Sequence, residues 1–149
     1  MALMQTFLLL GLDALLCTAE VKPGQKRVRF QCEQDPTLRL EWDFAPPPDF
    51  RSGRCAPADL RKDAGAFDLP IALGMLVATG QLLPEQLRDF ATMGELALDG
   101  SVRPIKGALS MAMAAASKSI PKLLVPAANA REAAVVEAVQ VFGVNHQRT

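Results

Sequence analysis

The sequence predicts an α/β (α+β) domain with a hairpin embedded in a partly parallel sheet. The apolar run 67–83 is long enough for a buried helix. The dipeptide Asp99-Gly100 is typical of a two-residue hairpin turn. After this turn, short apolar segments alternate with helix-forming ones, as in sheets whose parallel strands are joined by helices. The 149 residues, half of them hydrophobic, suffice for one core and one ordinary domain.

The first half of the chain is irregular in composition. The stretch 6–16 is apolar except at Asp13, so we expect a buried strand or helix there. A secretion signal is the alternative, although no basic leader precedes the stretch and no clean cleavage pattern follows it. Residues 27–30 and 38–42 alternate like half-exposed strands, and the prolines at 46–48 prevent a central strand. Since no run reaches about 18 apolar residues, we expect no membrane span.

The second half of the chain is more regular. Residues 67–83 predict a helix buried on most faces, with Asp68 in its first turn and Pro70 tolerated near its start. The elements expected next are a short helix at 84–87, a strand at 92–98 and its hairpin partner at 101–105.

Four further elements are expected before the C-terminal tail. Residues 107–118 are rich in Ala, Met and Leu and predict a helix. Residues 122–125 predict a short buried strand. Asn129 lies three residues before Glu132, as in a capping box, so a helix should begin there. Residues 139–144 predict the last strand.

The composition argues against several functional classes. Sixteen basic and sixteen acidic side chains balance, so the net charge gives no general attraction to DNA or anionic membranes. Cys17, Cys32 and Cys55 are widely spaced, which favours buried thiols in the cytoplasm over a zinc site or a disulfide framework. His146 is the single histidine, so we expect no histidine-based metal site and no Ser–His triad.

Nucleotide-binding motifs are absent from the sequence. It contains no GxxxxGK[ST] phosphate loop, no GxGxxG and no GxSxG. Without backbone donors, a phosphate-pairing lysine and a metal-holding hydroxyl in one loop, the chain has no recognisable site for ATP and magnesium. We therefore expect no cofactor in this chain.

Four motifs resemble those of one protein family. They lie at residues 56–63 (APADLRKD), 66–74 (AFDLPIALG), 94–107 (GELALDGSVRPIKG) and 124–130 (LVPAANA). In this order they resemble the N-terminal domain of the magnesium-chelatase-related, ComM-like (YifB-type) AAA+ proteins.

The resemblance divides the chain into three parts. Residues 1–55 correspond to a divergent and partly deleted front of the domain, residues 56–144 to its core, and residues 145–149 to a tail. By this resemblance we expect no ATPase module within these 149 residues, and we expect a segment of the relatives to be lacking between Gly24 and Arg27. A truncated or frameshifted fragment without activity is therefore one hypothesis for this chain.

The resemblance implies a Lon-protease-like fold of the ribosomal-S5-domain-2-like class. In the longer relatives this domain precedes an ATPase module, which uses ATP and magnesium, and the protein assembles as a hexameric ring. The ComM branch is associated with DNA branch migration during transformation. The expected partners are a second copy or an AAA+ ATPase subunit, with DNA reached through the assembly, no membrane, and a cytoplasmic location.

The resemblance also allows a test for proteolysis. A Lon-type protease uses a serine activated by a lysine. The nucleophile position falls at Ala66 and the base position near Leu109, so both positions of the dyad are vacant. A cryptic peptidase that uses Lys106 with Ser110 or Ser101 is the alternative.

The favoured hypothesis is a non-proteolytic domain that assembles with, or regulates, a DNA-processing ATPase. On this hypothesis Arg103, Lys106 and Lys118 are candidates for a surface that faces another subunit or DNA. The alternative is that these three side chains are ordinary solvated cations.

Overall fold

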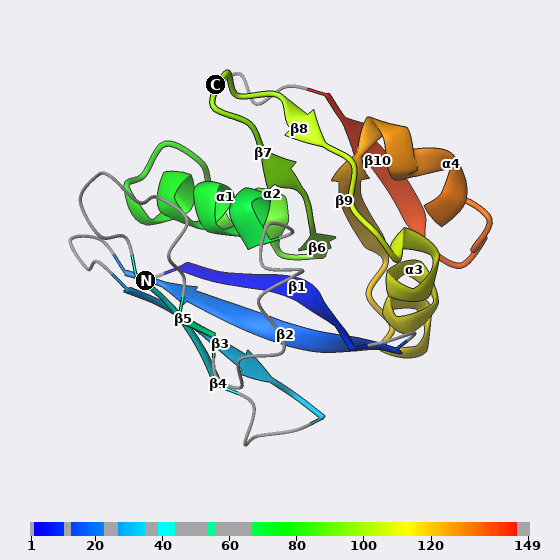
Figure 1. Cartoon of the computed structure of the whole chain (residues 1–149), viewed down its shortest axis with the longest axis horizontal. Coiled ribbons are helices and arrows are strands. Elements are labelled where there is room, and N and C mark those ends of the chain that lie inside the picture. Colours follow the sequence, from blue (N-terminus) through cyan, green and yellow to red (C-terminus); the bar gives the residue numbers. More distant parts are fainter. Residues whose placement is uncertain are drawn as a thin grey trace.

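The computed structural model describes residues 2–10, 13–22, 27–34, 39–43, 54–55 and 67–145. Within them, eight strands form one sheet in the order β10-β9-β6-β1-β2-β3-β4-β5, and β7 pairs with β8 apart from it. Figure 1 shows helices on both sides of this sheet. The first half of the chain contributes β1 (Ala2–Leu10), β2 (Asp13–Val21), β3 (Arg27–Cys32), β4 (Arg39–Asp43) and β5 (Arg54–Cys55). The mixed α/β class expected from the sequence is confirmed.

The first five strands form an antiparallel meander. β1 pairs with β2 from Ala2↔Val21 to Leu10↔Asp13, and β3 continues the sheet through Cys17↔Cys32. The strands expected at 27–30 and 38–42 are confirmed as β3 and β4. The apolar stretch 6–16, expected to be one strand or helix, contains the end of β1 and the start of β2, which begins at Asp13.

The remaining elements lie in the second half of the chain. The helices are α1 (Asp68–Ala78), α2 (Pro84–Leu87), α3 (Ala108–Ser117) and α4 (Ala130–Ala133), with a 3₁₀ turn at Ala127–Asn129. The strands are β6 (Phe90–Thr92), β7 (Glu95–Leu96), β8 (Val102–Arg103), β9 (Lys122–Pro126) and β10 (Gln140–Val144). The predicted helix at 107–118 and the predicted strands at 122–125 and 139–144 are confirmed.

Helix α1 ends earlier than expected. The run 67–83 predicts a helix through Leu83, but α1 stops at Ala78. Gly80 has φ +80°, and the N–H groups of Gly80 and Gln81 donate to the carbonyls of Val77 and Leu76. These two bonds form a Schellman cap, which closes the helix at a left-handed glycine. Asp68 in the first turn and Pro70 near the start are as predicted.

The hairpin is not embedded in the main sheet, and this corrects the sequence-based topology. The strand expected at 92–98 is split into β6 and β7, since the N–H of Met93 donates to Leu124 and the carbonyl of Gly94 accepts from Leu69. β6 therefore stays in the large sheet while β7 leaves it. The Asp99-Gly100 turn is confirmed, and Gly100 has φ +85°. Its return strand β8 is shorter than the expected 101–105.

Two hydrophobic cores cover opposite faces of the sheet. Side chains alternate across a strand, so Met4 and Leu8 of β1 point to one face and Phe7 to the other. Met4 and Leu8 belong to the cluster that packs under α1, and Phe7 belongs to the cluster that packs under α3. Figure 1 shows α1 and α3 over different parts of the sheet. Within the described ranges, no helix is both long enough and apolar enough to cross a membrane.

Candidate interaction surface

The hairpin of β7 and β8 is tied to helix α1 by a carboxylate. The N–H of Leu96 in β7 donates to Oδ2 of Asp68 over 3.1 Å. Asp68 stands in the first turn of α1, where a negative charge is stabilised by the positive end of the helix dipole. Gly94 precedes the hairpin, and a Cβ there would lie 3.0 Å from Val102 and 3.1 Å from Leu69. The hairpin therefore packs closely against α1.

Asn129 fixes the segment that follows the hairpin. The N–H of Ile105 donates to Oδ1 of Asn129, and Nδ2 of Asn129 donates to the carbonyl of Ile105, both over 2.9 Å. Only 6% of Asn129 is exposed. This two-way amide bond mimics a backbone pairing and satisfies polar groups that are costly to bury alone. Asn129 thereby sets the position of the backbone between Arg103 and Lys106.

The capping role expected for Asn129 is wrong in one respect. It stands at the N-cap of α4, so the predicted helix start is confirmed, but its side chain makes no capping bond to the backbone of that helix. The side chain bonds the backbone of Ile105, and its Nδ2 also donates to Oε2 of Glu132 over 3.4 Å. Glu132 acts on a different helix as well. Its Oε1 accepts from the N–H of Leu109 in the first turn of α3, whose N-cap Gly107 has no side chain to offer. A carboxylate from α4 thus caps α3.

Gly107 completes the segment. Its φ is +79°, a backbone conformation that side chains with a Cβ disfavour. A Cβ at this position would lie 2.7 Å from Cδ2 of Leu9 in β1. The backbone after Lys106 therefore runs directly over β1, and α3 starts from there.

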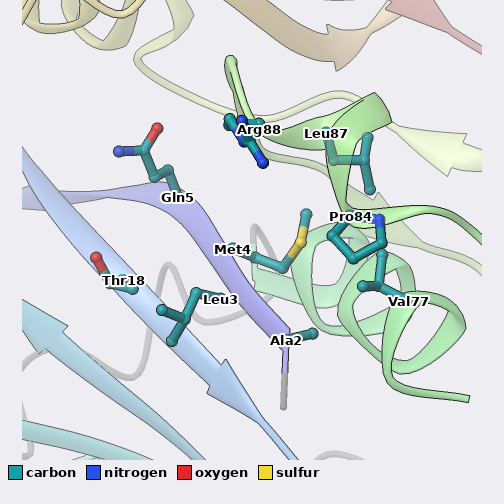
Figure 2. Close-up of a pocket in the computed structure, with 9 residues that line it drawn as sticks. All are labelled: Ala2, Leu3, Met4, Gln5, Thr18, Val77, Pro84, Leu87 and Arg88. Atoms are coloured by element: carbon teal, nitrogen blue, oxygen red, sulfur yellow. The ribbon is translucent and has the colours of Figure 1, made fainter.

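A pocket lies at the opposite end of β1. It has a volume of about 480 Å³ and is lined by β1, β2, α1 and the segment around α2. Figure 2 shows Met4, Val77, Pro84 and Leu87 along its apolar side, with Gln5 and Arg88 at its polar rim. The described lining offers an amide, a hydroxyl and a guanidinium but no carboxylate, imidazole, thiol or amine. Such a set can bind a group but cannot supply a general base.

The comparisons with known proteins agree on one family. The family model of subunit ChlI of Mg-chelatase matches residues 54–129, slightly more than half of the chain. The chain belongs to this magnesium-chelatase-related, ComM-like family. Competence protein ComM of Haemophilus influenzae is 37% identical over 139 residues, which cover 85% of this chain and 27% of that protein. The uncharacterised protein YifB of Escherichia coli is 43% identical over 81 residues, 54% of this chain and 16% of that protein.

These numbers also give the relative sizes of the proteins. The chain spans about a quarter or less of the length of the curated relatives that it matches. The segment matched by the ChlI family model contains the hairpin, Lys106 and Gly107, and it ends at Asn129. Asp68, Gly107 and Asn129 therefore lie within the segment that this model matches, whereas β1 to β4 precede it.

The structure separates the three predicted surface cations. Arg103 and Lys106 are both exposed and flank the pinned Ile105. Lys118 is exposed at the other end of α3, and its Nζ lies 3.5 Å from Oε2 of Glu33. A helix of this length rises about 15 Å. Lys118 therefore does not share a patch with the other two.

The structure places the predicted dyad positions as follows. Ala66 lies outside the described residues. Leu109 is in the first turn of α3 and is 37% exposed. The hydroxyl of Ser101 donates to Oδ1 of Asp99 over 2.6 Å, within the hairpin turn. In the part of the chain that is described, no hydrogen bond joins Lys106 to Ser101 or Ser110.

Sequence reasoning missed the anchoring residues. The sequence pattern indicates a helix start for Asn129 and a place in the first turn of α1 for Asp68, but not the contacts that either side chain makes with the hairpin segment. Each side chain bonds a backbone group more than 20 positions away in sequence, at 28 positions for Asp68 and 24 for Asn129. One signal could have indicated this role: Asn129 is a polar residue inside the apolar run 124–130, and a polar side chain buried there needs a hydrogen-bond partner.

Proposed function

We propose that this chain is a non-proteolytic Lon-like domain that serves as an assembly or regulatory module for an AAA+ ATPase in DNA processing. The observation that carries the proposal is the anchored segment that ends at Gly107. Asp68 and Asn129 fix it at both ends, and it presents Arg103 and Lys106 to solvent. A rigid exposed backbone with two cations is suited to docking, because little conformational entropy is lost when a partner binds.

Several observations support a binding role over a catalytic one. Leu109 has an isobutyl group at the position where the resemblance expects a base. The hydroxyl of Ser101 donates to the carboxylate of Asp99 and not to a lysine amine, which is the base that a Ser–Lys dyad requires. ATP and magnesium belong, on this proposal, to the ATPase module of the longer relatives. The ribosomal-S5-domain-2-like fold and a cytoplasmic location are parts of the same proposal.

The proposed partner is an AAA+ ATPase subunit or a second copy of this chain. One relative, ComM of Haemophilus influenzae, is named a competence protein. Its length beyond the matched part leaves room for the ATPase module that the family resemblance implies. DNA would then be contacted by the assembly, where Arg103 and Lys106 add positive charge at the docking surface.

The test of this proposal measures association directly. The purified chain is mixed with the part of the Haemophilus influenzae relative that follows the matched segment, and native mass spectrometry records the complexes with and without ATP. We expect a complex that contains this chain and a change in the rate of ATP hydrolysis. The double variant Arg103→Ala/Lys106→Ala should weaken the complex at least about tenfold, as loss of charged interface contacts does.

Lys118→Ala is the matched control. It removes an exposed lysine at the C-terminal end of α3, and the helix of about 15 Å separates it from Lys106, which precedes the helix. Association that is unaffected by the double variant, or equally reduced by Lys118→Ala, would contradict the proposed docking surface. A chain that stays monomeric and leaves ATP hydrolysis unchanged would contradict the assembly role as a whole.

Two further measurements separate the alternatives. Fluorescence anisotropy with duplex DNA at low and high salt tests direct DNA contact, since phosphate contacts weaken steeply with salt. We expect salt-dependent binding by the assembled complex and none by the chain alone. A fluorogenic-peptide assay tests the cryptic peptidase, and we expect background rates for both the wild type and Lys106→Ala.

A further inference from the structure

Two cysteines face each other across neighbouring strands of the meander. Cys17 of β2 and Cys32 of β3 are direct partners in the antiparallel register. The N–H of Glu33 donates to the carbonyl of Leu16 over 2.9 Å, so the bonds flank this pair and do not join it. In such a non-hydrogen-bonded pair the Cα atoms are about 4.5 Å apart and the side chains are closest. The two Sγ atoms lie 2.6 Å apart.

This geometry is compatible with a covalent bond. Disulfides join Cα atoms about 4.4 to 6.8 Å apart, and the S–S bond is about 2.05 Å long. The two sulfur atoms therefore need to move little. Both residues lie on the face that packs under α1, at 0% and 1% exposure. Cys55 lies on β5, two strands away from β3, which corresponds to about 10 Å between the strand backbones.

We propose that Cys17 and Cys32 are a modification site at which an intrachain disulfide forms when the chain folds with a small-molecule disulfide such as oxidised glutathione. The thiolate of one cysteine attacks the glutathione disulfide and releases one molecule of reduced glutathione. The thiolate of the second cysteine then displaces the other glutathione. Two protein S–H bonds are lost and one S–S bond forms, and the two electrons and two protons leave with two glutathione thiols.

Burial determines when this exchange occurs. The hydrogen bond to Cys32 raises the pKa of the Cys17 thiol above its ordinary value, and burial raises it further. Because the thiolate is the attacking species, the folded dithiol reacts slowly. The exchange therefore takes place during folding, before the core under α1 buries the two sulfur atoms. Once formed, the disulfide is shielded by the same core from external reductants.

The bond would connect the meander covalently. Cys17 and Cys32 are 15 positions apart, so the bond closes a short loop and removes chain entropy from the unfolded state. For a chain of this size we expect the Tm of the oxidised protein to exceed that of the reduced protein by about 5 to 10 °C. The added stability comes from the antiparallel part of the sheet, and both cysteines precede the segment that the family model matches.

The experiment refolds the full chain from urea with oxidised and reduced glutathione, or with a phosphine reductant alone. Free thiols are then alkylated, and peptide mass mapping locates the disulfide. We expect a Cys17–Cys32 bond with Cys55 alkylated. The oxidised native protein should resist dithiothreitol for at least about ten times longer than the same protein in urea, because the buried sulfur atoms are inaccessible.

The control variants make the outcome unambiguous. Cys55→Ser should leave the disulfide and the Tm difference intact, whereas Cys17→Ala should abolish both. If Cys17→Ala does not fold, the comparison of oxidised and reduced Cys55→Ser protein still decides. Full alkylation of all three cysteines after refolding with glutathione, a disulfide that involves Cys55, or an oxidised protein with a lower Tm would overturn the proposal.

Discussion

The antiparallel meander and the parallel part of the sheet are stabilised in different ways. In the meander, β1, β2 and β3 pair over long registers and bury large apolar side chains such as Phe30 and Leu8. In the second half the strands are short, and loops are positioned by single polar side chains such as Asp68 and Asn129. The comparison teaches that buried apolar side chains stabilise the long strands of this fold. Hydrogen bonds from single polar side chains fix the backbone of the loops that follow the short strands.

The largest effect should come from the meander core. Phe30 is 2% exposed and its ring stacks on Phe67 with centroids 4.5 Å apart. Phe30→Ala should lower the free energy of unfolding by about 3 to 5 kcal/mol, through lost burial and an unfilled cavity. Urea unfolding followed by circular dichroism measures it. Leu3→Ala on β1, at a residue 60% exposed, should cost less than about 1 kcal/mol. Similar losses for both variants would contradict the idea that buried apolar area stabilises the meander.

The second effect tests the polar anchors. Asn129→Ala leaves the N–H and the carbonyl of Ile105 without their partner, which should cost about 2 to 4 kcal/mol. Hydrogen exchange should show faster exchange at the Ile105 amide. The Ser101 amide, which bonds Asp99 within the hairpin, serves as the internal control. Equal acceleration at both amides would show that Asn129 stabilises the whole hairpin and not this segment alone.

A third effect separates backbone strain from close packing. Gly107 and Gly80 have φ values of +79° and +80°, but only at Gly107 would a Cβ meet another side chain, Leu9 at 2.7 Å. Gly80→Ala should cost about 1 to 2 kcal/mol from the left-handed backbone alone. Gly107→Ala should cost more, and the difference in unfolding free energy measures the contact with Leu9. Equal costs would mean that Leu9 moves aside freely.

The smallest effect concerns the ion pair that spans the two regions. Lys118 at the end of α3 lies 3.5 Å from Glu33, and both side chains are well exposed. Lys118→Ala should change the free energy of unfolding by less than about 0.5 kcal/mol, since exposed pairs are screened by water and salt. Thermal unfolding at low and high salt provides the check. A loss above about 1 kcal/mol at low salt would show that this pair joins the halves.

The sequence predicted local elements better than their connections. Helix α3, the Asp99-Gly100 turn and strands β9 and β10 follow from composition and turn chemistry, which act over a few residues. The exit of β7 from the main sheet depends on Gly94, whose carbonyl accepts from Leu69 far away in sequence. Likewise, an asparagine before a helix favours capping locally, and only the fold brings Ile105 within reach of Asn129.

The candidate site was predicted unevenly for the same reason. Exposure of Arg103, Lys106 and Lys118 follows from their charge, but their grouping depends on the placement of α3 between Lys106 and Lys118. The contact between Cys17 and Cys32 depends on the register of β2 and β3, which spacing alone did not indicate.

Strand β6 connects the parallel and antiparallel parts of the sheet through very few backbone hydrogen bonds. It has three residues, and its pairing with β1 consists of the single bridge Gln5↔Ala91. The antiparallel ladder on one side and the parallel ladder on the other are each longer. The boundary between β6 and β1 is therefore the weakest seam of the sheet, where a small rotation of one part against the other breaks the fewest hydrogen bonds. A partner that binds the exposed end of one part would therefore bend the sheet most easily at this boundary.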